Sequence, residues 1–186
     1  MPKLAALVDG HTEQSFLQIT YPPDQIRIIR CLPNGDDVSL ERVAEEIIDK
    51  LATLSGEYDR VLVLFDREDR AATCADIAAQ LTQLTSAAIG DRTMLFGIKD
   101  IEIENWILAD ETFVRSLGDG AYTYTREGHS AKPTLSAFFR ESLSPQKKAA
   151  FLAGCAPTRI GAQSESFRVF AAQCADLNWW WLADDA

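Results

Sequence analysis

Acidic residues follow two apolar segments of the sequence at the points where these segments end. Asp9 directly follows the apolar run 3–8, and Glu13 stands four residues later, with Gly10 between them. Gly10 allows a tight turn from a strand into a helix, so Asp9 at the strand tip and Glu13 on the first helical turn would face the same opening. The plainer alternative is that Asp9 caps this helix and Glu13 complements its dipole.

A second acidic cluster follows the most strongly apolar segment of the chain, residues 61–65. Asp66 and Glu68 come next, and alternate residues of an extended segment point to the same side. We therefore expect these two carboxylates to bind one hard cation together. Acidic loops are common, so the main support for this metal-binding prediction is that the pair directly follows an apolar strand.

A third acidic cluster follows the fourth apolar segment and contains Asp100, Glu102 and Glu104. Glu104 stands at the start of an expected helix that Trp106 and its apolar neighbours would anchor. Glu102 alternates with Glu104 and could point either way. The alternative for Glu102 and Glu104 is simple solvation at the surface.

The types of these residues indicate which cation they would bind. The four cysteines form no CxxC pair and the chain has only two histidines, which argues against a zinc site or a disulfide framework and favours the cytoplasm. Oxygen ligands alone favour Mg²⁺ or Mn²⁺. Such ions serve phosphoryl transfer and phosphodiester hydrolysis, because they neutralise phosphate and orient the attacking water or hydroxyl. P-loop and Rossmann glycine patterns are both missing from the sequence.

Charge is unevenly distributed along the chain, whose formal net charge is −10. Residues 131–170 hold six basic and two acidic residues, a net +4, which leaves −14 on the remainder. An acidic body argues against a general nucleic-acid coat protein. The basic segment fits a phosphate-binding surface beside a carboxylate metal site, or alternatively a solvated helical face.

Alternating strands and helices must position these acids. Strands are expected at 3–8, 25–30, 61–65 and 93–98, with helices between them at 12–19, 40–54 and 73–88. Thr12 and Ser39 are the expected helix N-caps. This order is typical of right-handed βαβ units, in which sites lie at the carboxyl ends of parallel strands. We predict an α/β fold with an open, mainly parallel sheet of about four strands and helices on both faces.

The remainder of the chain is expected to form a helical C-terminal extension. Further helices are expected at 101–108, 111–117, 135–141, 145–152 and 166–175. We predict a single domain, 1–186, with a core at 1–110 and the extension at 111–186. The longest apolar runs of the whole chain, such as 61–65, are too short to cross a membrane. Trp179–Trp181 would either pack as a tail or dock a protein partner or a second copy.

Four short motifs, in order, resemble those of the TOPRIM family. They are LVDGHTEQSFL (7–17), VLVLFDRED (61–69), IENWILAD (103–110) and SESFRVF (164–170). The third and fourth motifs resemble those of a small bacterial branch of TOPRIM proteins, which is similar to the nuclease half of the OLD (overcoming lysogenization defect) proteins. Two departures stand out: the first acid of the family is usually Glu and is Asp9 here, and the second motif usually ends in DxD and has Glu68 here. Both departures change the reach of a carboxylate.

The resemblance implies a TOPRIM-like fold and a role for each matching residue. Asp9 would replace the general acid/base or metal-binding Glu of the family. Asp9 and Glu13 are the implied catalytic acids, and the implied metal ligands are Asp9, Glu13, Asp66, Glu68 and Glu104. Lys147 is our choice for the catalytic lysine that contacts phosphate, with Lys132 and Lys148 as rivals. The expected nucleic-acid-binding residues are Lys132, Lys148, Arg159 and Arg168.

The function predicted from these features is a Mg²⁺- or Mn²⁺-dependent nuclease or phosphotransfer enzyme acting on nucleic acid. The resemblance implies a setting in phage defence. One alternative is a non-catalytic TOPRIM-like partner of a nuclease or ATPase. Another is a small-molecule phosphohydrolase, because an acidic body disfavours long duplexes.

Overall fold

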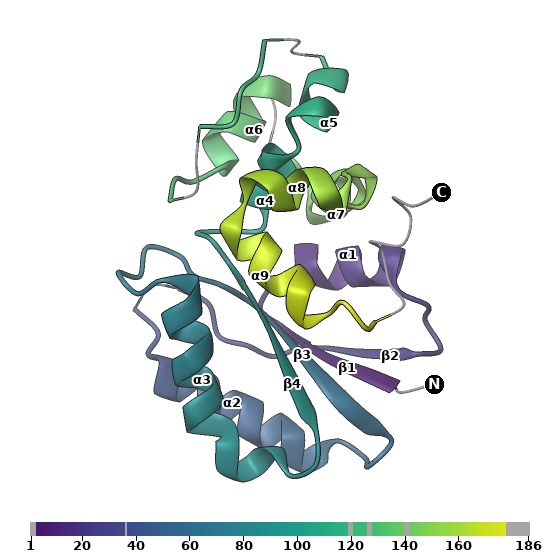
Figure 1. Ribbon diagram of the computed structural model, residues 1–186, viewed down its shortest axis with the longest axis vertical. Helices are drawn as coiled ribbons and strands as arrows, with labels where there is room; N and C mark the ends of the chain where they lie inside the picture. The colour runs from purple at the N-terminus through teal and green to yellow at the C-terminus, as the bar shows by residue number, and fades with distance from the viewer. Residues whose placement is uncertain (1–2, 36, 119–120, 126–127, 140–141, 178–186) are drawn as a thin grey trace.

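The computed structural model describes residues 3–35, 37–118, 121–125, 128–139 and 142–177. Four parallel strands form one open sheet in the order β2-β1-β3-β4 (Figure 1). They are β1 (Lys3–Val8), β2 (Ile26–Arg30), β3 (Tyr58–Asp66) and β4 (Thr93–Lys99). This confirms the predicted α/β fold with an open parallel sheet.

Helices cover both faces of the sheet. On one face lie α2 (Leu40–Thr53) and α3 (Cys74–Ile89), and on the other lie α1 (His11–Thr20) and α9 (Glu165–Gln173) (Figure 1). Residues 61–65 of β3 are apolar without interruption because both faces of the strand are buried there. Val61 and Val63 pack toward α2 and α3, whereas Leu62 and Leu64 belong to the opposite core.

One of the two predicted helix N-caps is confirmed and the other is wrong. Ser39 caps α2 by accepting a hydrogen bond from the Arg42 N–H, at 3.2 Å, as expected. The expected cap at Thr12 is wrong, because α1 already begins at His11 and Thr12 is buried inside it. Gly10, in an extended conformation, stands at the N-cap position and offers no side chain.

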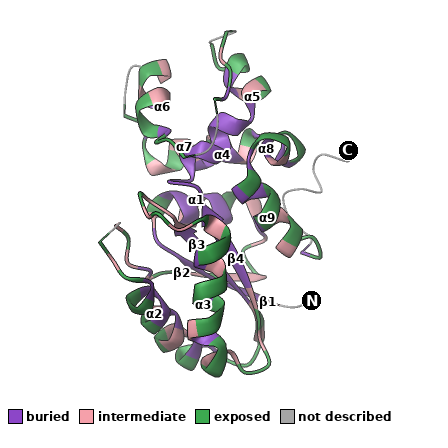
Figure 2. Cartoon of the chain, turned by 60° about the vertical axis from the view of Figure 1, so that its left-hand side comes forward, coloured by how far each residue is buried: buried purple, intermediate pink, exposed green. Residues whose placement is uncertain are grey.

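The part of the chain after β4 is helical, as expected, and returns to the sheet. It contains α4 (Glu104–Ala109), α5 (Glu111–Ser116), α6 (Lys132–Phe139), α7 (Pro145–Gly154), α8 (Pro157–Gln163) and α9. All six residues of α4 are buried (Figure 2). The Trp106 ring of α4 lies 5.1 Å from the rings of Phe167 and Phe170 on α9.

Helix α9 also contacts the free edge of β4. The Gln173 side-chain amide accepts a hydrogen bond from the Phe96 N–H at 2.9 Å and donates one to the Phe96 carbonyl at 3.0 Å. Within the described ranges, the helices are all too short or too polar to cross a membrane. The predicted Trp179–Trp181 contact lies outside the described residues.

Candidate metal centre

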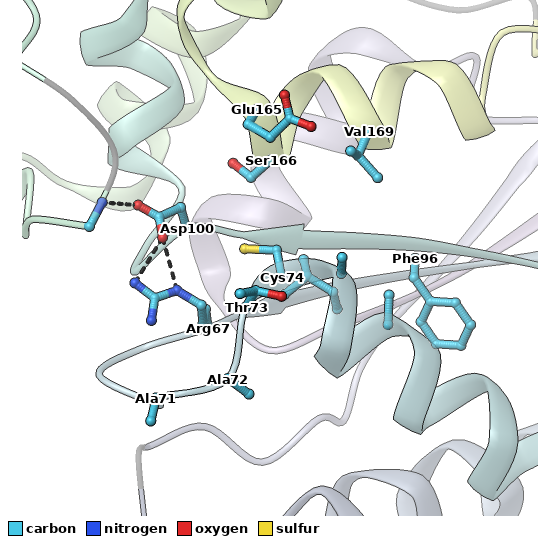
Figure 3. A pocket seen from close by; sticks show the side chains of 14 residues that line it. Arg67, Ala71, Ala72, Thr73, Cys74, Phe96, Asp100, Glu165, Ser166 and Val169 are labelled. Carbon is cyan, nitrogen blue, oxygen red and sulfur yellow. Dashed lines mark hydrogen bonds and ion pairs between the residues drawn. The ribbon is translucent and has the colours of Figure 1, made fainter.

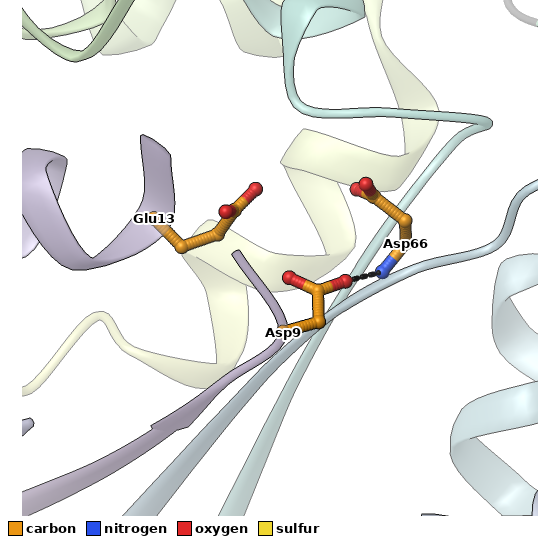
Figure 4. A group of neighbouring side chains, drawn as sticks. All are labelled: Asp9, Glu13 and Asp66. Atoms are coloured by element: carbon orange, nitrogen blue, oxygen red, sulfur yellow. Dashed lines mark hydrogen bonds between the residues drawn. The ribbon is translucent and has the colours of Figure 1, made fainter. Parts of the chain in front are cut away.

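Three acidic side chains meet at the carboxyl edge of the sheet. Asp9 follows β1 directly, Asp66 is the last residue of β3, and Glu13 lies on the first turn of α1 (Figure 4). One oxygen from each lies within 4.8 Å of the others. The structure thus brings together three of the five residues that were expected to hold a metal.

The strand register explains why these side chains meet. Val8 pairs with Leu64, so Asp9 emerges beside the end of β3. Asp9 Oδ2 accepts a hydrogen bond of 2.7 Å from the Asp66 N–H, which joins the ends of the two strands. The Asp9 side chain therefore links the ends of β1 and β3. The alternative that Asp9 caps α1 is wrong, because no side chain caps the start of this helix.

Lys99, the last residue of β4, is a further member of this cluster that the sequence did not suggest. Register places it opposite Asp66, and its side chain is fully buried. Its Nζ lies 3.1 Å from Asp9 Oδ1, 2.7 Å from Glu13 Oε1 and 2.9 Å from Asp66 Oδ1. The alternation of side chains along a strand was the available indication, because it puts Lys99 on the same side as the core residue Leu95.

Burial shifts the protonation of this cluster. With all four groups ionised, three carboxylates and one ammonium carry −2. Burial raises the pKa of Asp66 well above its ordinary value and that of Asp9 above it, with Lys99 opposing both shifts. Burial alone would lower the pKa of Lys99, yet the three carboxylates raise it well above its ordinary value. The ammonium is therefore charged, and the raised pKa values of the two acids reflect burial and mutual repulsion of carboxylates, both of which a divalent cation would offset.

One carboxylate oxygen in this cluster has spare capacity to bind a ligand. Asp66 Oδ1 is buried and within ion-pair distance of Lys99 Nζ, but it accepts no hydrogen bond from the described residues. Lys99 donates hydrogen bonds to Asp9 and Glu13 instead. Asp66 Oδ1 has only an ion pair with Lys99 and no hydrogen bond among the described residues, so it keeps lone pairs that a hard metal ion or a water could use.

Gly10 makes room for the Glu13 carboxylate. A Cβ atom at position 10 would overlap Glu13 Oε2, whereas the backbone of Gly10 itself is in an ordinary extended conformation. The expected role of Gly10 was a conformational one in the turn. The structure shows instead that a glycine is required at position 10 because a larger residue would collide with the Glu13 carboxylate.

Glu68 and Glu104 lie outside the group of three acids. The segment after β3 is not extended, because Glu68 adopts a left-handed conformation with φ of 54°. Its N–H donates to the carbonyl of Ile101, at 3.0 Å, and Ile101 is also left-handed, with φ of 56°. The Glu104 carboxylate is buried in α4 and forms an ion pair with Lys148.

The other two acids after β4 also have partners. Asp100 forms an ion pair with Arg67, at 2.8 Å, which joins the segments that follow β3 and β4 (Figure 3). Glu102 is buried and pairs with Lys132, at 2.7 Å, while accepting a hydrogen bond from Ser130. The surface-solvation alternative for Glu102 and Glu104 is therefore wrong, because both acids are buried and each is paired with a lysine.

The basic residues expected to bind nucleic acid each pair with an acid of the chain itself. The pairs are Lys132 with Glu102, Lys148 with Glu104, Arg159 with Asp110, and Arg168 with Glu165. Lys132 and Lys148 line a small cavity of about 70 Å³ together with Glu104. The Lys147 ammonium lies 5.3 Å from the centre of the Phe139 ring and 5.9 Å from that of Phe151.

A larger cavity of about 480 Å³ lies beside β4, between the start of α3 and the start of α9 (Figure 3). Its lining is mostly apolar and includes Phe96 and Ile98, and the Arg67–Asp100 pair also lines it. Phe96 and Ile98 point to the opposite side of β4 from Lys99. This cavity is therefore separate from the acid cluster.

Comparison of the chain with protein-family models, with curated proteins and with solved structures finds no match. The TOPRIM resemblance of its four motifs accordingly stays a prediction.

Proposed function

We propose that this chain is a Mg²⁺- or Mn²⁺-dependent phosphotransfer enzyme with a TOPRIM-like site that hydrolyses phosphodiester bonds in nucleic acid. The observation that carries the proposal is the convergence of Asp9, Glu13 and Asp66, whose oxygens lie within 4.8 Å of one another at the carboxyl edge of a parallel sheet. This edge is where open α/β sheets bind their ligands. When bound, the ion would supply charge neutralisation and a more acidic bound water.

The chain also offers cations for the phosphate beside this cluster. Burial alone would lower the pKa of Lys132, but its hydrogen bond to Glu102 and the charges of Glu104, Glu102 and Asp66 raise it. Lys132 is thus a charged group within electrostatic reach of Asp66, and its side chain is half exposed. These contacts favour Lys132 over Lys147 as the group that would pair with a substrate phosphate.

The decisive measurement is calorimetric titration of the protein with Mn²⁺ and Mg²⁺. Asp66→Asn keeps the shape of the side chain but removes its charge, so it should weaken Mn²⁺ binding at least about tenfold. Glu68→Gln is the matched control, because it neutralises an acid two residues away that lies outside the group, and it should bind Mn²⁺ like the natural chain. No binding of either ion by the natural chain, or equal binding by Asp66→Asn, would sink the proposal.

Activity is measured separately on single-stranded DNA, duplex DNA and RNA oligonucleotides, with and without a chelator. Cleavage that depends on Mn²⁺ or Mg²⁺ and is lost in Asp66→Asn is expected. The four cysteines, all among the described residues, form no disulfide, which suits the reducing cytoplasm in which we propose that the enzyme acts. The motif resemblance is the basis for proposing phage defence as its setting.

One observation favours a second candidate, a non-catalytic partner protein. Lys99 Nζ already lies within 3.1 Å of all three acids, as a cation that permanently replaces a metal would. Under that alternative, the natural chain binds no divalent cation and cleaves nothing, and it co-purifies with a nuclease or ATPase whose activity survives Asp66→Asn.

A further inference from the structure

Lys99 contacts the same oxygens that the proposed metal ion would need. The oxygens nearest its Nζ are Asp9 Oδ1, Glu13 Oε1 and Asp66 Oδ1, and the whole side chain is buried. An ammonium ion donates hydrogen bonds to carboxylate oxygens at about 2.7–2.9 Å, and Mg²⁺ binds such oxygens at about 2.0–2.1 Å. Two cations at one set of oxygens would repel each other strongly at this depth.

The other oxygens of two of these acids are already directed elsewhere. Asp9 Oδ2 accepts the Asp66 N–H, and Glu13 Oε2 lies against Gly10, where even a Cβ atom would not fit. A metal ion that uses Asp9 and Glu13 together therefore approaches the oxygens that Lys99 now contacts. Entry of the ion requires the ammonium to leave them.

We propose that Lys99 is a resident counterion, which occupies the cation position of the metal-free protein and gives it up when a divalent ion binds. The inference rests on the proposed function and assigns a regulatory role to one more residue of the same site. Its physical reason is the charge of the cluster: without Lys99, three buried carboxylates would carry −3 with no counterion. Lys99 thus stabilises the metal-free fold and lowers metal affinity.

A purely positioning role for Lys99 predicts the opposite effect on metal binding. If the ammonium only held the carboxylates in place for the metal, its removal would loosen the site and weaken binding. If the ammonium competes with the metal, its removal strengthens binding, because the cluster becomes more negative and its oxygens are released. The direction of the change therefore distinguishes the two roles.

The experiment compares the natural chain with Lys99→Met, which retains much of the apolar stem and lacks the charge. Calorimetric titration should show Mn²⁺ binding at least about tenfold tighter in the variant. Thermal unfolding in chelator should show a lower melting temperature for the variant, and Mn²⁺ should restore most of the loss. Lys148→Met is the matched control: it also removes a lysine from a buried carboxylate, Glu104, but that acid lies outside the group, so Mn²⁺ should not restore its stability.

Each outcome separates this inference from the proposed function. If the natural chain binds Mn²⁺ and Lys99→Met binds it equally or more weakly, the counterion role is wrong and the proposed metal site stands. If Lys99→Met alone binds Mn²⁺, the counterion role is supported and the proposed activity of the natural chain fails. If neither binds, both fail. Should Lys99→Met not fold, Lys99→Gln, which is neutral but can still donate hydrogen bonds, replaces it in the same two measurements.

Discussion

Asp110 is a fully buried carboxylate with several donors around it. It accepts hydrogen bonds from the Phe113 N–H at 3.0 Å and the Ala156 N–H at 2.8 Å, and it forms a two-point ion pair with Arg159. Burial alone would raise the pKa of Asp110, but these donors lower it below its ordinary value of 3.8. This one side chain therefore caps α5 and fixes the start of α8 in its charged form.

Asp110→Asn should destabilise the protein by about 2 kcal/mol at neutral pH, because the variant loses the ion pair and turns an amide toward backbone donors. A carboxylate with a lowered folded-state pKa contributes stability above its unfolded-state pKa and loses that stability as the pH falls through the folded-state value. The difference between the natural chain and the variant should therefore shrink below pH 3.8.

The measurement for Asp110 is chemical denaturation of both proteins from pH 7 downward. Asp91→Asn, at an exposed position, is the control for a simple loss of charge and should change little at any pH. A difference that stays constant through the acidic range would contradict the assigned protonation of Asp110.

The acids of the candidate site could be predicted from the sequence where a strand ends in a carboxylate. Asp9 and Asp66 were found this way, since apolar runs mark strands reliably. Glu68 was placed beside Asp66 on the assumption of an extended segment, but the backbone turns at that residue. Lys99 was missed because alternation along the strand gives the side on which it lies, but does not show whether the end of a short strand is buried or exposed.

At the scale of elements, the contact of β4 with α9 depends on a glycine. A Cβ atom at Gly97 would overlap Leu64 on β3 and approach Phe170 Cδ2 to 3.0 Å. Both neighbours are buried, so neither side chain can move away into solvent. The absence of a side chain at Gly97 is therefore what lets the Phe170 ring lie on the sheet.

Gly97→Ala should destabilise the fold by about 2 kcal/mol through overpacking. Urea unfolding measures the change as a shift in midpoint with an unchanged slope. Gly56→Ala is the matched control, because its added Cβ meets no atom within 4 Å, and it should be close to neutral. A Gly97→Ala variant as stable as the natural chain would mean that α9 does not pack on β4 this closely.

The long elements were predictable, and one short helix was not. The strands and α1–α3 follow from apolar runs and from helical spacing with clear breaks between them. Helix α8 has only seven residues, and its buried residues are Pro157 and Ile160. Two buried positions are too few to form a helical pattern that can be recognised in the sequence. The return of α9 to the sheet depends on pairs such as Gln173 with Phe96, which are 77 residues apart and leave no local trace.

For the whole molecule, charge limits how nucleic acid can bind. The chain carries −10 overall, and the basic residues of segment 131–170 that were expected to bind nucleic acid are paired with its own acids. A phosphate strand must compete with those acids, so it gains less than it would from unpaired cations. We therefore expect moderate affinity and few counterions released.

The logarithm of the affinity for a labelled single-stranded oligonucleotide should fall with the logarithm of salt concentration with a slope no steeper than about −3, as four contacts allow. Fluorescence anisotropy at several salt concentrations measures this. Arg168→Gln should flatten the slope by about one unit at most, whereas Arg27→Gln, on β2 outside the basic segment, should leave it unchanged. A slope near zero with tight binding of a free nucleotide would favour the small-molecule phosphohydrolase instead.

The glutamine amide on the edge of β4 has a consequence for the protein in a crowded solution. An open sheet exposes rows of backbone donors and acceptors, which invite further strands to add and start fibrillar growth. At Phe96, Gln173 satisfies one donor and one acceptor as a neighbouring strand would, but it is a side chain and offers no new edge. Helix α9 thus terminates the sheet chemically as well as covering it, and the opposite edge, β2, bears the exposed charges of Arg27 and Arg30. Resistance to self-association is in this way built into both margins of the sheet.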